Sequence, residues 1–128
     1  MAPSSEVNGS QVVMEVPYCE QDWYFLAVSS NSSGTWYQIN DQHGKCLDAD
    51  LNHINSLGDK VQVWDCNGSA QQHWYAPNGN NTELINGANT NFVLDARTDG
   101  TWNPSMNGDP LQLYSPNGSP QQTWYELH

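Results

Sequence analysis

Residues 62–77 read QVWDCNGSAQQHWYAP, and residues 112–127 read QLYSPNGSPQQTWYEL. Both stretches contain a Gln-x-Trp triplet, and the two tryptophans, Trp74 and Trp124, lie fifty positions apart. A third triplet, Gln-Asp-Trp at residues 21–23, lies about the same distance upstream of Trp74. Three triplets at near-constant spacing, two of them in matching context, indicate an internal repeat.

Each of the two later repeats contains four short runs in which apolar and polar residues alternate, as in half-buried strands. Turn sequences such as Asn-Gly and Gly-Asp separate the runs, and Asn-Gly closes tight hairpins because it tolerates positive φ. The expected strands span 36–39, 45–49, 61–66 and 72–75 in repeat two and 83–85, 92–96, 111–114 and 122–125 in repeat three. Four strands in each of three repeats predict an all-β, pseudo-threefold closed structure, because closure removes sheet edges.

Composition and charge limit the classes of function. The chain has 128 residues, enough for one domain with its own core. Its net charge is −11, with only three Lys and Arg residues, so it lacks the basic surface that a nucleic acid or an anionic membrane requires. No apolar run is long enough to span a bilayer, so membrane insertion is not expected.

The later repeats contain the motifs of a known family. Residues 44–48 read GKCLD and residues 61–68 read VQVWDCNG, ahead of a Gln-x-Trp triplet. In this order and spacing they resemble the ricin-B-type (R-type) lectin β-trefoil family, from about residue 36 to the end of the chain. The resemblance implies a carbohydrate-binding β-trefoil with pseudo-threefold Gln-x-Trp repeats. We expect a single domain over 1–128, with repeat one at 1–35, repeat two at 36–78 and repeat three at 79–128.

Repeat one departs from this pattern. Only 22 residues precede Trp23, and none of them matches the GKCLD motif. Residues 10–16 fit a third strand, equivalent to 61–66 in repeat two. We therefore expect an incomplete first repeat without a ligand site, whose other half is missing, degenerate or supplied by another chain. The protein would then be part of a larger chain or a homo-oligomer.

The cysteines fit the same family. The resemblance implies a Cys46–Cys66 disulfide, and repeat three has Val93 and Pro116 at the two matching positions, so both partners are absent there. Cys19 has no matching partner and is either a buried free thiol or bonded to a segment outside this chain. A disulfide requires an oxidising compartment, which predicts a secreted or extracellular protein.

The resemblance also carries over a set of ligand residues. A sugar site needs a carboxylate or amide to bind adjacent hydroxyls and an aromatic wall for the apolar face of the ring. In the family these come from the Asp after the second strand, the aromatic residue ending the third strand, and polar residues near Gln-x-Trp. The matching residues are Asp48, Gln62, Trp64, Gln71 and Gln72 in repeat two, and Asp95, Gln112, Tyr114, Gln121 and Gln122 in repeat three.

Each of these residues also has a purely structural interpretation. The triplet tryptophans are expected in the core, and the triplet glutamines are expected to hold the backbone in part. Asp48 and Asp95 could only cap turns, and Trp64 could be an exposed strand residue. The ligand interpretation is favoured because Asp, Gln and an aromatic residue occur together in both repeats. Gln71 and Gln121 stand where the family usually has Asn. This longer amide departs from the family pattern and weakens the prediction of a preference for galactose.

Catalysis is not expected. A glycosidase needs two carboxylates that face one bond across a cleft, whereas the acidic residues here are scattered through the repeats. The four histidines lie beside no candidate nucleophile and lack metal-ligand spacing, so neither a cofactor nor a metal is predicted.

The predicted function is therefore a lectin or module that binds galactose-type glycans, with galactose, N-acetylgalactosamine or lactose as first candidates. One alternative is the binding module of a secreted glycoside hydrolase or toxin that targets xylan or a cell-surface glycan. Another is a protease inhibitor or protein-interaction module that acts through loops 29–34 and 98–109, because a fold does not determine function.

Overall fold

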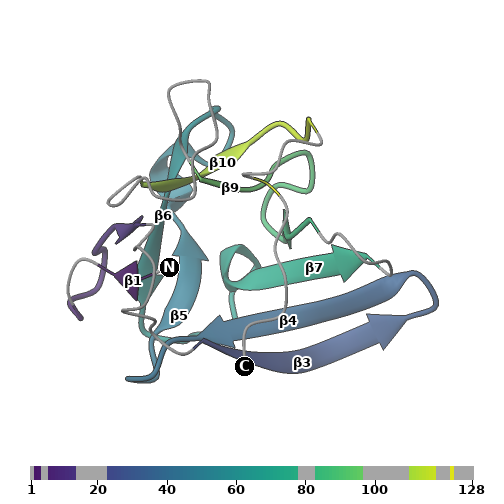
Figure 1. The fold of residues 1–128 in the computed structure, drawn as a ribbon, viewed down its shortest axis with the longest axis horizontal. Helices are drawn as coiled ribbons and strands as arrows, with labels where there is room; N and C mark the ends of the chain where they lie inside the picture. Colours follow the sequence, from purple (N-terminus) through teal and green to yellow (C-terminus); the bar gives the residue numbers. More distant parts are fainter. Residues whose placement is uncertain are drawn as a thin grey trace.

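The computed structural model describes residues 2–3, 6–13, 23–77, 83–96, 110–117 and 122. Within these residues it contains β-strands and two short 3₁₀ helices, and no α-helix (Figure 1). The elements are β1 (Ala2–Pro3), β2 (Val12–Val13), β3 (Tyr24–Asn31), β4 (Gly34–Asn40), β5 (Cys46–Ala49), η1 (Leu51–His53), β6 (Asp59–Trp64), η2 (Ala70–Gln72), β7 (His73–Pro77), β8 (Ile85–Asn86), β9 (Val93–Ala96) and β10 (Leu111–Tyr114). The all-β prediction is confirmed.

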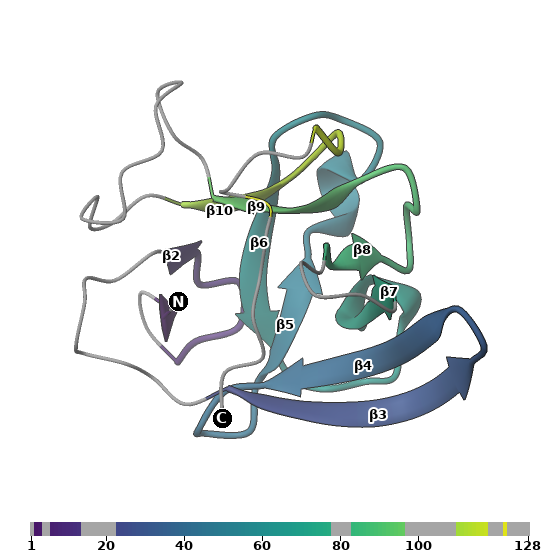
Figure 2. The same ribbon diagram turned by 45° about the vertical axis from the view of Figure 1, so that its right-hand side comes forward.

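Among the described residues, seven strands close into a ring. The order of hydrogen-bonded neighbours is β4, β5, β6, β10, β9, β8 and β7, and β7 pairs again with β4. Strand β3 forms a long hairpin with β4, and β5 and β6 lie between this hairpin and the β9–β10 pair (Figure 2). No helix among the described residues is long and apolar enough to cross a membrane.

Repeats two and three are built in the same register. Strand β5 pairs with β6 so that Asp48 lies opposite Gln62, and β9 pairs with β10 so that Asp95 lies opposite Gln112. The central strands thus occur where the alternating pattern predicts them, and the fourth strand of repeat three falls outside the described residues except for Gln122.

The third strand of repeat two begins and ends two residues earlier than the predicted range 61–66. It spans Asp59–Trp64 and ends before Asp65 and Cys66, which were expected within it. The Gln72 side chain explains this end, because its Nε2 donates to the Asp65 carbonyl at 3.0 Å and its Oε1 accepts from Asn67 N at 2.9 Å. The backbone there bonds to a side chain and therefore leaves the sheet. At Gly68, which follows Asn67, φ is +74°, as the Asn-Gly turn predicts.

A glutamine from the incomplete first repeat joins all three repeats. Gln11 Nε2 donates to the backbone oxygens of Val12, Val61 and Leu111, each at 2.9 Å. These three residues are buried and lie at the repeat spacing along the chain. One amide, with two hydrogens to share, thus bonds one backbone carbonyl in each of the three repeats.

The triplet tryptophans lie in the core, as predicted, where they are described. Trp23 and Trp74 are buried among aliphatic residues such as Leu47, Val61 and Leu94. Trp74 Nε1 also donates to the Leu47 carbonyl at 3.0 Å, which satisfies the polar edge of the indole. Trp124 falls outside the described residues.

The Cys46–Cys66 disulfide implied by the family resemblance is present. It links β5 to the turn after β6, across a sequence separation of 20 residues. We expect the double substitution Cys46→Ala and Cys66→Ala to lower the free energy of unfolding by about 3 kcal/mol, because a loop of this length loses its closure constraint in the unfolded state. Urea unfolding measures this change.

The matched control is the unsubstituted protein under reducing conditions, which should unfold at the same urea concentration as the double variant. A double variant as stable as the oxidised protein would contradict the prediction. Cys19 falls outside the described residues.

Candidate functional site

The site in repeat two is organised around Asp48 on β5. This carboxylate is 3% exposed and accepts a hydrogen bond on each oxygen. Gln62 Nε2 donates to Oδ1 and Gln72 Nε2 donates to Oδ2, both at 2.9 Å. The two amides fix the plane of the carboxylate, while each oxygen retains further capacity to accept.

Repeat three reproduces this arrangement around Asp95 on β9. Gln112 Nε2 donates to Oδ1 at 2.9 Å, and Gln122 Nε2 donates to Oδ2 at 2.7 Å. Gln122 also donates to the Ser115 carbonyl and accepts from Asn117 N, just as Gln72 bonds the backbone of repeat two. The same local geometry therefore occurs twice.

The glutamines of the Gln-x-Trp triplets in repeats two and three are buried and bond the carboxylates from the interior of the protein. Gln72 and Gln122 are completely buried, so each positions a carboxylate and a turn rather than reaching the surface. Gln71 is also largely buried, and it lines the surface pocket described below. Its counterpart, Gln121, falls outside the described residues.

Burial changes the acidity of the two carboxylates. Desolvation raises the pKa of Asp48 above its ordinary value, and hydrogen bonds from Gln62, Gln72 and Gln71 oppose the rise. Desolvation likewise raises the pKa of Asp95, against hydrogen bonds from its own two glutamines. Both carboxylates are poised to gain from further donors such as hydroxyls, because desolvated anions are short of hydrogen bonds.

An aromatic residue lies two positions beyond the strand partner of each carboxylate, on the same face of the sheet. Trp64 ends β6 and is 39% exposed, and Tyr114 ends β10 and is 37% exposed. Both residues are therefore partly open to solvent, although most of the other residues in their strands are buried. An exposed aromatic face beside a buried acceptor is suited to a ligand with one apolar side and several hydroxyls.

At each site, a glycine of the preceding repeat bonds to the strand that carries the aromatic residue. Gly9 N donates to the Val63 carbonyl, and Gly58 N donates to the Leu113 carbonyl, both at 2.8 Å. Gly9 has φ of +91°, and a Cβ there would lie 3.5 Å from the Trp64 ring. These glycines were not predicted as site residues, although their spacing matches the repeat and could have revealed them.

A surface pocket of about 310 Å³ opens above Asp48. Besides Gly9, four of its lining residues were not predicted, because they follow the motif or lie on the next strand. The lining residues are Gly9, Asp48, Asp50, Leu51, Asn52, Lys60, Gln62, Trp64 and Gln71. Lys60 Nζ donates to the Gly9 carbonyl at 2.9 Å, so the cation holds the glycine at the pocket edge.

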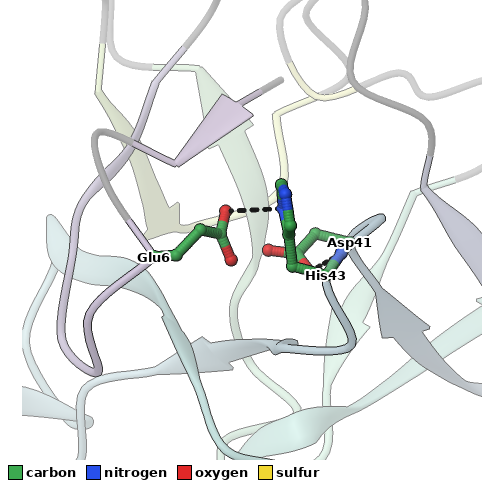
Figure 3. Close-up of side chains that lie close together, drawn as sticks. All are labelled: Glu6, Asp41 and His43. Carbon is green, nitrogen blue, oxygen red and sulfur yellow. Dashed lines mark hydrogen bonds and ion pairs between the residues drawn. The ribbon is translucent and has the colours of Figure 1, made fainter.

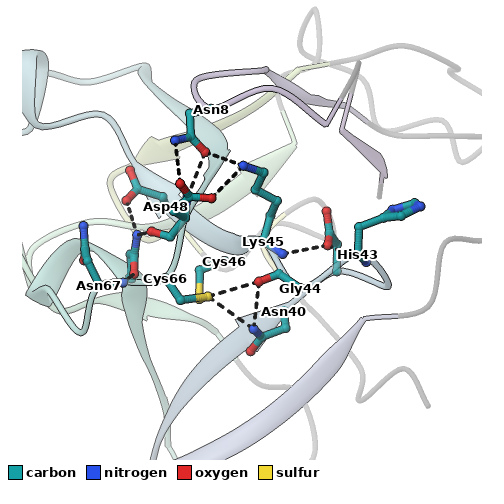
Figure 4. Close-up of polar contacts among 12 residues, drawn as sticks. Asn8, Asn40, His43, Gly44, Lys45, Cys46, Asp48, Cys66 and Asn67 are labelled. Atoms are coloured by element: carbon teal, nitrogen blue, oxygen red, sulfur yellow. Dashed lines mark hydrogen bonds and ion pairs between the residues drawn. A yellow bond between two sulfur atoms is a disulfide. The ribbon is translucent and has the colours of Figure 1, made fainter.

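A polar network fixes the N-terminal segment beside this pocket (Figure 4). Lys45 Nζ donates to Asn8 Oδ1 and to Asp65 Oδ1, each at 2.7 Å. Asn8 also bonds Asp65 through its Nδ2 at 3.1 Å and accepts from the Asp65 backbone N at 2.9 Å. The lysine holds the pKa of Asp65 below its usual range.

Asp59 is a buried acid close to the pocket. It is 2% exposed, and neither carboxylate oxygen has a hydrogen-bond partner among the described residues. Burial and the charge of Asp50 raise the pKa of Asp59 from 3.8 to about 6. Below pH 3.8 this carboxyl is protonated in both the folded and the unfolded state, whereas above pH 6 the folded state carries an unfavourable charge.

We therefore expect Asp59→Asn to raise the free energy of unfolding by about 1–3 kcal/mol at pH 8. This gain should shrink as the pH falls through 6 and vanish near pH 3.5. Urea unfolding of both proteins across this range measures the difference. Asp65→Asn is the matched control: the pKa of Asp65 is lowered, so its removal should destabilise at pH 8. A pH-independent effect of Asp59→Asn would contradict the prediction.

Comparison with known proteins identifies the architecture. The family model for "Ricin-type beta-trefoil lectin domain-like" matches residues 20–114. A designed threefold-symmetric protein, ThreeFoil, aligns over 97% of this chain and 85% of its own, with a TM-score of 0.81 and 21% identity. A mosquitocidal holotoxin aligns over 96% of this chain and 15% of its own, with a TM-score of 0.76 and 22% identity. No curated protein matches the sequence. The predicted β-trefoil is confirmed.

Proposed function

Because the chain belongs to the ricin-type β-trefoil lectin domain-like family, we propose that it binds galactose-type glycans through sites in repeats two and three. Asp48 and Asp95 accept hydrogen bonds from neighbouring sugar hydroxyls, and Trp64 and Tyr114 cover the apolar face of the ring. The observation that carries this proposal is the repeated carboxylate held by two amides beside a half-exposed aromatic residue.

The geometry of each carboxylate supports selection by hydroxyl orientation. Gln62 and Gln72 hold Asp48 in one plane, so its remaining lone pairs point in fixed directions. Two adjacent hydroxyls that match these directions form two charge-assisted hydrogen bonds, whereas an epimer with one hydroxyl reversed forms only one. The family resemblance makes galactose, N-acetylgalactosamine and lactose the first sugars to test.

The sites of repeats two and three differ in the residues around the carboxylate and the aromatic side chain. Lys60 lines the pocket of repeat two, and Pro110 occupies the position that matches it in repeat three. Asn52 and Asp50 add further polar groups to the pocket of repeat two. A volume of about 310 Å³ accommodates one sugar ring, and such an open site binds weakly. Two weak sites gain effective affinity when both engage one multivalent glycan.

The same chemistry suits a binding module within a secreted hydrolase or toxin. The mosquitocidal holotoxin supports this version, because the matching domain is only 15% of its chain. The disulfide supports a secreted or extracellular location. In either version the chain contributes binding rather than catalysis, and its partners are glycans.

A glycan array with free galactose as competitor tests the proposal. The protein should give signals that galactose displaces, and the double variant Trp64→Ala and Tyr114→Ala should give none. Each single variant should retain weaker binding, because one site remains. A blank array from folded, disulfide-bonded protein would reject the proposal, and loop 29–34 would then be tested against proteases. Signals that only a different sugar displaces would reject galactose while retaining the sugar site.

A further inference from the structure

A second cluster of polar side chains lies outside the pocket. Glu6 belongs to the N-terminal segment, and Asp41 and His43 belong to the turn between β4 and β5 (Figure 3). His43 Nδ1 lies 3.3 Å from Glu6 Oε2. One potential ligand atom from each of the three residues lies within 4.8 Å of the other two. None of the three lines the sugar pocket.

The Asp41 carboxylate points into this cluster. Its Oδ1 accepts from the backbone N of His43 at 2.8 Å and of Lys45 at 2.9 Å, which holds the turn. Its Oδ2 is buried and has no hydrogen-bond partner among the described residues. Figure 3 shows that one Asp41 oxygen is directed toward Glu6, opposite the oxygen that bonds the turn. The residue is 2% exposed, so water reaches this oxygen poorly.

A buried carboxylate oxygen without a donor is costly and calls for a compensating group. The neighbouring cation does not supply it, because Lys45 Nζ is held by Asn8 and Asp65 at 2.7 Å. The chain contains only three Lys and Arg residues in total. His43 alone faces the two carboxylates, and its nitrogen is a metal ligand when neutral.

We propose that Glu6, Asp41 and His43 bind a divalent transition-metal ion of the Zn²⁺ class. One imidazole nitrogen and two carboxylate oxygens are ligands that Zn²⁺ accepts, with water completing the shell. Ca²⁺ and Mg²⁺ prefer all-oxygen shells with more ligands, so they suit this set less well. The ion would neutralise both carboxylates and supply the partner that Asp41 Oδ2 lacks.

Such an ion would join the N-terminal segment to the β4–β5 turn. Glu6 lies three residues before Gly9, which lines the sugar pocket, so the same segment serves both sites. The metal proposal nevertheless does not rest on sugar binding, because it concerns different side chains. Its test therefore uses metal alone.

Isothermal titration of untagged protein with ZnCl₂ at neutral pH is the experiment. The expected result is one site per chain, weakened at least tenfold by His43→Ala and at least tenfold by Glu6→Gln. His43 and Glu6 are partly exposed, so both variants should fold. His53→Ala is the matched control, since His53 is an exposed histidine outside the cluster, and it should bind Zn²⁺ as the parent does.

Three outcomes would overturn the proposal. The first is no Zn²⁺ binding at millimolar concentration, which would leave only an ion pair between His43 and Glu6. The second is equal binding by the parent and His43→Ala, which would place the metal elsewhere. The third is CaCl₂ binding more tightly than ZnCl₂ in parallel titrations, which would contradict the assigned class of metal.

Discussion

The double substitution Asp48→Ala and Asp95→Ala is expected to abolish retention of the protein on immobilised galactose-type glycans. Each carboxylate would form two charge-assisted hydrogen bonds with sugar hydroxyls, and such bonds contribute about 1.5–3 kcal/mol each. Losing two of them weakens a site by about a hundredfold or more, since 1.4 kcal/mol is a tenfold change. Affinity chromatography and titration with free galactose measure the loss.

Controls separate loss of binding from loss of fold. Each alanine removes the carboxylate that accepts from two glutamine amides, so the variant must first be shown to retain its sheet structure by circular dichroism. Glu83→Ala removes an acid outside the pocket lining and should be retained like the parent protein. A folded double variant that still binds would reject Asp48 and Asp95 as ligand residues. Protease inhibition that the double substitution leaves unchanged would favour a loop-based inhibitor.

Trp74→Ala is expected to destabilise the fold most strongly of the substitutions considered. Trp74 is completely buried and its Nε1 bonds the Leu47 carbonyl. Removing an indole from a packed core lowers the free energy of unfolding by about 3–5 kcal/mol, and the orphaned carbonyl adds to the loss. Because domains of this size are stable by only about 5–15 kcal/mol, the variant should lose a large fraction of its stability and unfold at a much lower urea concentration. Urea unfolding measures the change.

Trp64→Ala provides a matched comparison, because it makes the same chemical change on the adjacent surface. Trp64 is 39% exposed, so its removal should cost far less stability while weakening sugar binding at repeat two. Trp74→Ala should instead cause a large loss of stability without removing a residue of the sugar site. Equal losses of stability in the two variants would contradict the assignment of one tryptophan to the core and the other to the site.

Much of the site could be predicted from local spacing. Asp48 and Gln62 lie on neighbouring strands of one hairpin, and Asp95 and Gln112 repeat them. The members of each pair lie close together in the sequence. Because the same Asp–Gln pair occurs in both repeats, it is distinguished from a chance match. The burial of Gln72 and Gln122 could not be predicted in the same way, because it depends on how a turn folds over the strand end.

Residues that meet across repeats were harder to predict. Gly9 borders the pocket of the next repeat, and Lys60 Nζ reaches across to bond its carbonyl. Neither residue belongs to the motif around Asp48. The first repeat was predicted to be incomplete and to lack a ligand site, yet its Gln11 joins the backbones of all three repeats.

The sequence by itself determined the all-β class, the repeat, the core tryptophans and the paired Asp–Gln–aromatic sets, because these are recorded in periodic spacing along the chain. The tertiary structure alone decided the pocket lining, the position of Gln11 among three carbonyls, and the meeting of Glu6 with Asp41 and His43. These contacts join segments tens of residues apart, and no local sequence motif shows which segments meet. They exist because the N-terminal segment bonds to β6, where Gln11 bridges to Gln62 and Gly9 N donates to the Val63 carbonyl.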